Sequence, residues 1–113
     1  IHRRSWELDK LGDALVVRDE ISGNRAQPVS LNWHFSEECS VTCTPEGLLV
    51  ANGPVNLEII LPPNGEVSLL RGSDTPLAGW VSRGYDRLVP STTVVWRGNV
   101  EPGQELETRL RRV

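Results

Sequence analysis

The residues with the clearest chemical potential lie in segment 78–85, which reads Ala-Gly-Trp-Val-Ser-Arg-Gly-Tyr. Trp80, Arg83 and Tyr85 follow one another closely there, with glycines beside and between them. An aromatic face can stack on a sugar ring, and a guanidinium can bind carboxylate or sulfate groups. The same residues can equally fill a core and form a strand corner. We therefore treat Trp80, Arg83 and Tyr85 as candidate substrate contacts and keep the structural alternative open.

Two other tryptophans follow an alternating pattern that predicts burial. Trp33 is in phase with Leu31 and Phe35, and Trp96 is in phase with Val94. Residues two apart on a strand point to the same face of the sheet. Both indoles are therefore predicted to lie in the core rather than in a ligand site.

The two histidines, His2 and His34, are the candidates for metal or acid-base chemistry. A metal site would form if both met a carboxylate such as Asp19 across neighbouring strands, but no His-x-His or His-x-x-x-His pair requires one. His34 alternates with Asn32 on a polar face, so it joins the candidate substrate contacts. His2 is expected to be mobile near the chain end, and it is the one remaining metal candidate.

No other catalytic arrangement is indicated by the residue types and their spacing. A Gly-x-Ser-x-Gly elbow is absent, and neighbouring acids such as Glu37 and Glu38 point to opposite faces of a strand. Cys39 and Cys43 would lie about 13 Å apart in an extended strand, beyond the roughly 7 Å that a disulfide spans. We predict two small buried thiols and no catalytic residue.

Composition limits the class of protein. The chain has 113 residues and a formal net charge of −3, which fits one domain over residues 1–113 and argues against a nucleic-acid partner. No apolar run of about eighteen residues predicts a membrane span, and no signal peptide is visible. The chain begins with Ile1 and contains no methionine, so we expect a fragment of a longer protein or a processed chain.

The segments that must position these residues read as strands. Alternating or apolar runs separated by Gly, Pro and Asn turns predict about ten short strands and an antiparallel β-sandwich. The expected strands cover residues 4–9, 14–19, 29–36, 39–44, 48–51, 55–61, 66–71, 79–82, 92–97 and 105–112. The predicted core consists of Trp6, Leu15, Val17, Leu31, Trp33, Phe35, Leu57, Ile59 and Trp96.

The order of several short motifs resembles the C-terminal β-sandwich domain of heparinase II/III-like polysaccharide lyases. The motifs are His-Arg-Arg-Ser-Trp-Glu-Leu at 2–8, Leu-Val-Val-Arg-Asp-Glu-Ile-Ser-Gly at 15–23, Leu-Asn-Trp-His-Phe-Ser at 31–36, Gly-Trp-Val-Ser-Arg-Gly-Tyr at 79–85 before Pro90, and Glu-Thr-Arg-Leu at 107–110. The resemblance covers nearly the whole chain.

This resemblance implies a function for the parent protein. Such lyases join an α/α toroid to a β-sandwich and cleave uronic-acid polysaccharides by β-elimination, in which a base takes the proton α to the carboxyl. Their catalytic residues lie mainly on the toroid and on an earlier strand with a Gly-x-His-x-His-x-Asp-like motif. Both are absent here, so the chain resembles the distal, non-catalytic part of the β region.

The resemblance also bears on cofactors and partners. Some members hold zinc in the sandwich, but residues 24–27 read Asn-Arg-Ala-Gln where relatives often carry a histidine. We therefore predict no cofactor for this chain and leave a structural zinc or calcium to the intact parent. The implied partners are the N-terminal toroid domain and an acidic polysaccharide, with neither nucleic acid nor membrane. A periplasmic or secreted location is favoured by the resemblance.

The sequence thus favours a non-catalytic module that supports a catalytic domain and lines its substrate cleft through Trp80, Arg83, Tyr85 and His34. Two alternatives stay open. One is a stand-alone carbohydrate-binding module that uses the same aromatic residues. The other is a structural interaction domain, which predicts an exposed apolar patch where a missing domain docks.

Overall fold

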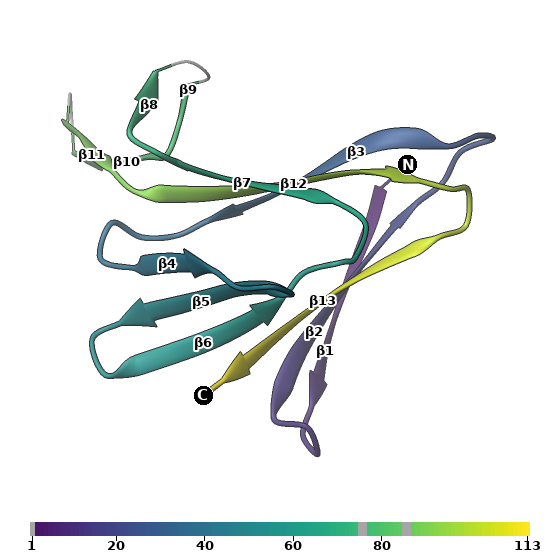
Figure 1. The fold of residues 1–113 in the computed structure, drawn as a ribbon, viewed down its shortest axis with the longest axis horizontal. Coiled ribbons are helices and arrows are strands. Elements are labelled where there is room, and N and C mark those ends of the chain that lie inside the picture. The colour runs from purple at the N-terminus through teal and green to yellow at the C-terminus, as the bar shows by residue number, and fades with distance from the viewer. Residues whose placement is uncertain (1, 75–76, 85–86) are drawn as a thin grey trace.

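The computed structural model describes residues 2–74, 77–84 and 87–113, and its described elements are all strands, arranged in antiparallel sheets (Figure 1). This confirms the predicted all-β, sandwich-like fold. The strands are β1 (His2–Asp9), β2 (Ala14–Ile21), β3 (Gln27–His34), β4 (Ser40–Cys43), β5 (Gly47–Asn52), β6 (Val55–Ile60), β7 (Glu66–Arg71), β8 (Ser73–Asp74), β9 (Leu77–Ala78), β10 (Trp80–Gly84), β11 (Arg87–Pro90), β12 (Thr92–Val100) and β13 (Glu105–Arg112). No helix long and apolar enough to cross a membrane occurs in these ranges.

Two sheets of unequal width form the body of the molecule. In the described ranges, the wider sheet has six strands in the order β1-β2-β13-β6-β5-β4, and the narrower has three in the order β3-β12-β7. The last strand, β13, lies between β2 and β6, so the two ends of the chain meet in one sheet. Figure 1 shows the narrower sheet lying across the wider one, with the β8–β9 and β10–β11 hairpins at one end.

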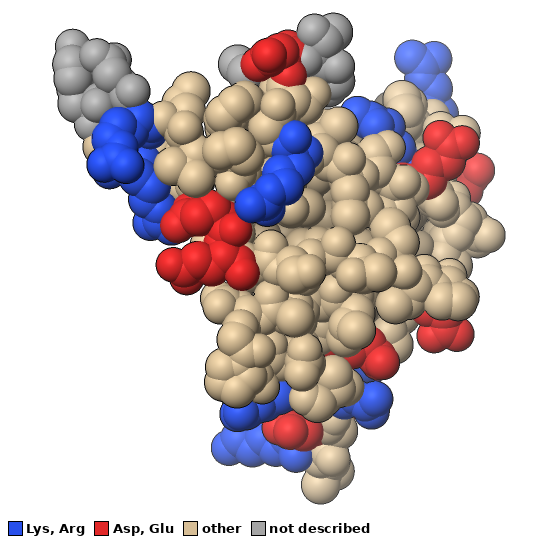
Figure 2. All heavy atoms as spheres, turned by 60° about the vertical axis from the view of Figure 1, so that its left-hand side comes forward, with Lys and Arg blue, Asp and Glu red and all other residues tan. Residues whose placement is uncertain are grey.

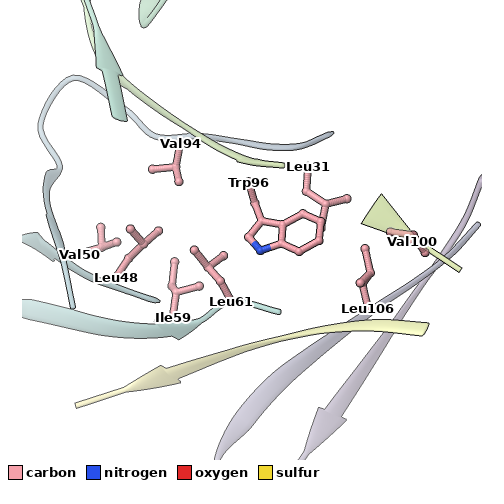
Figure 3. Close-up of a cluster of buried hydrophobic side chains, with 9 residues drawn as sticks. All are labelled: Leu31, Leu48, Val50, Ile59, Leu61, Val94, Trp96, Val100 and Leu106. Carbon is pink, nitrogen blue, oxygen red and sulfur yellow. The ribbon is translucent and has the colours of Figure 1, made fainter. Parts of the chain in front are cut away.

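The core lies between the facing sides of these two sheets. Figure 3 shows Trp96 of β12 near its middle, among apolar side chains from both layers. The indole is 1% exposed, and its Nε1 donates a hydrogen bond of 2.9 Å to the Pro62 carbonyl. A Cβ atom on Gly65 would lie 2.2 Å from the same ring, so the loop after β6 can pass the indole only with a glycine. The buried cluster contains Leu31, Leu48, Val50, Ile59, Leu61, Val94, Trp96, Val100 and Leu106.

The predicted core is confirmed in its centre and wrong at one edge. Four of the nine predicted residues are at most 1% exposed: Val17, Leu31, Ile59 and Trp96. Another four are half-buried: Leu15, Trp33, Phe35 and Leu57. The prediction fails at Trp6, which is 58% exposed although its register partner Val17 is fully buried. Trp6 lies on the edge strand of the wider sheet, beyond the cover of the narrower one.

The cysteine predictions have a mixed outcome. Both thiols are free, as the spacing in an extended strand predicts. Their predicted burial is wrong for Cys43, which is exposed, while Cys39 is half-buried. Cys43 ends β4, the other edge strand of the wider sheet, where less of the molecule covers it.

One buried hydroxyl yields a prediction about stability. Thr108 on β13 is fully buried, and its Oγ1 has no hydrogen-bond partner in the described structure. A buried polar group without a partner costs about 1–3 kcal/mol. We expect Thr108→Val, which keeps the shape and removes the hydroxyl, to raise the free energy of unfolding by about 1 kcal/mol. Chemical denaturation measures this change.

The matched control is Thr42→Val on β4, where the side chain is exposed. It should change the free energy of unfolding by less than about 0.5 kcal/mol. A loss of stability in Thr108→Val would show that the hydroxyl has a partner and would contradict the prediction.

Candidate functional site

A close approach of three backbone segments fixes the position of Trp80. Gly79 has φ +79°, and a Cβ atom there would lie 2.6 Å from the Leu70 carbonyl oxygen. Its own carbonyl accepts hydrogen bonds of 2.8 Å from the backbone N–H groups of both Gly72 and Ser91. The glycine thus serves the close approach that this residue type permits. Trp80 follows directly and is half-buried, and its Nε1 donates to the Ser73 carbonyl at 2.9 Å.

A cleft of about 490 Å³ lies where the β10–β11 hairpin meets the outer face of the narrower sheet. Trp80 and Leu88 line it from the β10–β11 hairpin, and Asn32, His34, Thr93 and Arg97 line it from β3 and β12. The register explains the grouping, because His34 lies opposite Thr93 and Asn32 opposite Val95 on adjacent strands. Two of the four predicted contacts, Trp80 and His34, are therefore brought together.

The polar side chains of the cleft differ in how firmly they are held. His34 Nδ1 lies 3.1 Å from Thr93 Oγ1, an interaction that orients the ring. Arg97 is exposed, and no carboxylate pairs with its guanidinium in the described part of the chain. Sequence reasoning missed Arg97. Its position next to the buried Trp96 was a usable signal, because strand alternation places it on the opposite face.

Arg83 lies outside this lining and is paired with a carboxylate. Its Nε donates to Glu37 Oε2 at 2.9 Å, and Arg71 Nη2 donates to the Glu37 carbonyl at 3.1 Å. The Arg83 contact joins the β10–β11 hairpin to the loop that follows β3, and the Arg71 contact joins β7 to the same loop. The hydrogen bond from Arg83 holds the pKa of the Glu37 carboxyl below its usual value, and the same bond raises the pKa of Arg83. Tyr85, the fourth candidate, lies outside the described residues.

Charges of both signs are mixed on this side of the molecule. Figure 2 shows Lys and Arg side chains next to Asp and Glu side chains, separated by broad uncharged areas.

A larger hollow of about 630 Å³ lies elsewhere, between the Thr44–Gly47 turn and the loop from Pro62 to Gly65. Its lining contains neither an aromatic nor a cationic side chain. The cleft beside Trp80 is therefore the better candidate for a polar ligand.

A second cluster of polar residues surrounds Asp19 on the inner face of the wider sheet. Asp19 is fully buried, and its Oδ1 lies 2.7 Å from His2 Nε2 and 2.6 Å from Arg4 Nε. The predicted mobility of His2 is therefore wrong, because the residue belongs to β1 and contacts Asp19. His34 lies in the other sheet, so the metal site that would combine both histidines with Asp19 does not form. No group of three or more potential metal ligands occurs among the described residues.

The comparison with known families agrees with this architecture. Residues 1–110 match a family described as heparinase II/III-like, C-terminal. The chain belongs to this family of C-terminal domains, which suggests an N-terminal catalytic domain as its partner. Neither the curated proteins nor the solved structures gave a match.

The Glu37–Arg83 pair generates a prediction for pH dependence. Because the pKa of Glu37 is lowered in the folded state, its contribution to stability is present above its ordinary value of 4.5. That contribution is lost as the pH falls through the lowered value. We expect Glu37→Gln to lower Tm near neutral pH, and the Tm difference from the parent to shrink as the pH falls from about 6 to about 3.

Thermal unfolding of both proteins across this pH range measures the difference. Glu38→Gln is the matched control, because in the described structure Glu38 makes no contact within ion-pair distance and attracts Arg83 only weakly. A Tm difference that stays constant over the whole range would contradict the role of the Glu37 carboxylate.

Proposed function

We propose that this chain is a non-catalytic β-sandwich module of a polysaccharide lyase-like protein whose parent cleaves uronic-acid polysaccharides by β-elimination. The module supports the catalytic domain and lines its substrate cleft. The observation that carries this proposal is the cleft where Trp80, His34 and Arg97 converge. Family membership supplies the link to a polysaccharide lyase.

The side chains of the cleft suit an acidic sugar. The indole of Trp80 offers an aromatic face beside the apolar Leu88, and sugar C–H groups pack on such a face. Arg97 offers a planar guanidinium that can bind a uronate carboxylate in two-point fashion. Asn32 and His34 add hydrogen-bonding groups for hydroxyls. The volume of the cleft falls within the range of small-molecule sites.

The proposed module leaves the chemical step to its partner. β-Elimination needs a base for the proton α to the carboxyl and an acid for the leaving oxygen. In the described lining of the cleft, His34 is the one imidazole, no carboxylate is present, and its ring lies beside Thr93 rather than beside a second acid or base. We therefore assign the catalytic groups to the N-terminal domain and a binding role to this chain.

A second candidate function, a structural interaction domain, is favoured by the edge of the wider sheet. Trp6 and Leu8 on the inner face of β1 are 58% and 64% exposed. Neighbouring exposed apolar side chains are a feature of protein contact sites. In a C-terminal domain of this family, the N-terminal domain is the partner that such a surface would contact. One domain can have both functions, because they use different surfaces. A measurement of glycan binding tests the first function and not the second.

Substitution of Trp80 tests the binding role. We expect Trp80→Ala to weaken binding of a uronic-acid oligosaccharide by at least about tenfold, because the stacking face is lost. Isothermal titration calorimetry on the whole 113-residue chain measures the affinity. Arg97→Gln should weaken the acidic ligand more than a neutral glucan oligosaccharide, since it removes the cation from the cleft.

The matched control for this test is Trp6→Ala, which removes an exposed indole from the opposite sheet. It should leave the glycan affinity unchanged, with the fold checked by circular dichroism. Equal loss of binding in both tryptophan variants, or no loss in Trp80→Ala, would sink the proposed sugar contact.

The absence of catalysis is a separate prediction. The purified chain should produce no ultraviolet absorbance from unsaturated uronates when it is incubated with uronic-acid polysaccharides. A commercial polysaccharide lyase on the same substrates serves as the positive control. Any activity that purifies with this chain would overturn the assignment of a non-catalytic role.

A further inference from the structure

The carboxylate of Asp19 is fully buried and therefore needs charged or hydrogen-bonding partners inside the protein. A buried ion is stable only when it is paired and hydrogen-bonded. Asp19 receives two partners from β1: His2 Nε2 and the guanidinium of Arg4. The β1–β2 register places Arg4 directly opposite Asp19, so the pairing follows from strand alignment.

Arg4 makes a two-point contact that uses both carboxylate oxygens. Its Nε lies 2.6 Å from Oδ1 and its Nη2 lies 3.2 Å from Oδ2. The guanidinium also lies 4.8 Å from the ring centroid of Trp33 and 5.9 Å from that of Trp6. Such cation–π contacts further stabilise a partly desolvated cation. Because Trp33 belongs to β3 in the narrower sheet, the cluster links the two layers.

The same cluster bears on the structural zinc that the family resemblance implies for some members. A structural zinc needs four ligands in a tetrahedral arrangement, and His2 and Asp19 would supply two. Both of these are already engaged with each other, and Arg4 contacts both oxygens of Asp19. A guanidinium keeps its positive charge and has no lone pair to offer a metal. The residues of this site therefore do not fit a divalent cation.

We infer that the Arg4 guanidinium is the permanent cation of the His2–Asp19 site, so that this pair binds no divalent metal and instead fastens β1 to β2 and to Trp33. The inference does not depend on the proposed sugar contact, which lies on the outer face of the narrower sheet. It makes the attachment of the first strand independent of metal supply.

The experiment measures Zn²⁺ uptake by equilibrium dialysis and Tm with Zn²⁺ or with EDTA. All proteins carry Cys39→Ser and Cys43→Ser, so that thiol-bound zinc is not counted. The parent should show no saturable uptake and no change in Tm. Arg4→His should gain one zinc site and a Tm that rises with Zn²⁺, because positions 2 and 4 of β1 face the same side, toward Asp19. The two imidazoles and Asp19 would supply three ligands, and water would supply the fourth.

Two matched variants complete the design. Arg3→His places the new imidazole on the other face of β1 and should gain neither zinc nor stability. Arg4→Lys keeps the charge but loses the two-point contact, so it should still exclude zinc while having a lower Tm than the parent. If Arg4→His is unfolded without metal, circular dichroism should show folding on addition of Zn²⁺.

Saturable zinc uptake by the parent that His2→Gln abolishes would overturn the inference, because the pair would then bind metal beside Arg4. A folded Arg4→His variant that gains no zinc would also overturn it, since Arg4 would not occupy the cation position.

Discussion

The unequal width of the two sheets is the constraint on which the rest of this structure depends. In the described chain, three strands face six, so part of the wider sheet lies beyond the cover of the narrower one. Apolar residues of β5, β6 and β13 pack there against Trp96 and its neighbours. On the edge strand β1, Trp6 and Leu8 stay exposed, and Arg4 contacts the narrower sheet through Trp33. The outer face of the narrower sheet is free to form one side of a cleft.

The two faces of the narrower sheet thus have different roles: one packs into the core and the other lines the cleft. Successive residues of β3 show this directly, because Trp33 packs toward the core and Arg4 while His34 lines the outer cleft. A change that shifts the register of β3 would exchange these faces. The pairing of β3 with the long central strand β12 fixes that register through eight residue pairs. Core packing and the candidate site are therefore positioned by the same ladder.

Polar interactions hold the parts that the core does not reach. The Asp19 cluster fastens the uncovered edge strand, and the contact between Arg83 and Glu37 fastens the outer hairpin. The Asp19 carboxylate is fully buried, so removing Arg4 would leave it with His2 as its one side-chain partner in the described structure and is expected to destabilise the fold. The Glu37–Arg83 pair is more exposed and is expected to stabilise the fold less. The two ion pairs thus serve strand attachment and hairpin docking with different strengths.

The sequence by itself determined ten of the strands and the burial of Trp96, because alternation with a period of two is a local property of the chain. The short strands β8, β9 and β11 were not predicted. The need for glycine at Gly79 came from the tertiary structure, because the Leu70 carbonyl oxygen lies where a Cβ atom would be placed. Tertiary structure decided which faces are covered, and this is why Trp6 is exposed although its alternation predicts burial. It also decided that Trp80, His34 and Arg97 meet and that His2 contacts Asp19, because strand order and sheet stacking are set by contacts between residues distant in sequence.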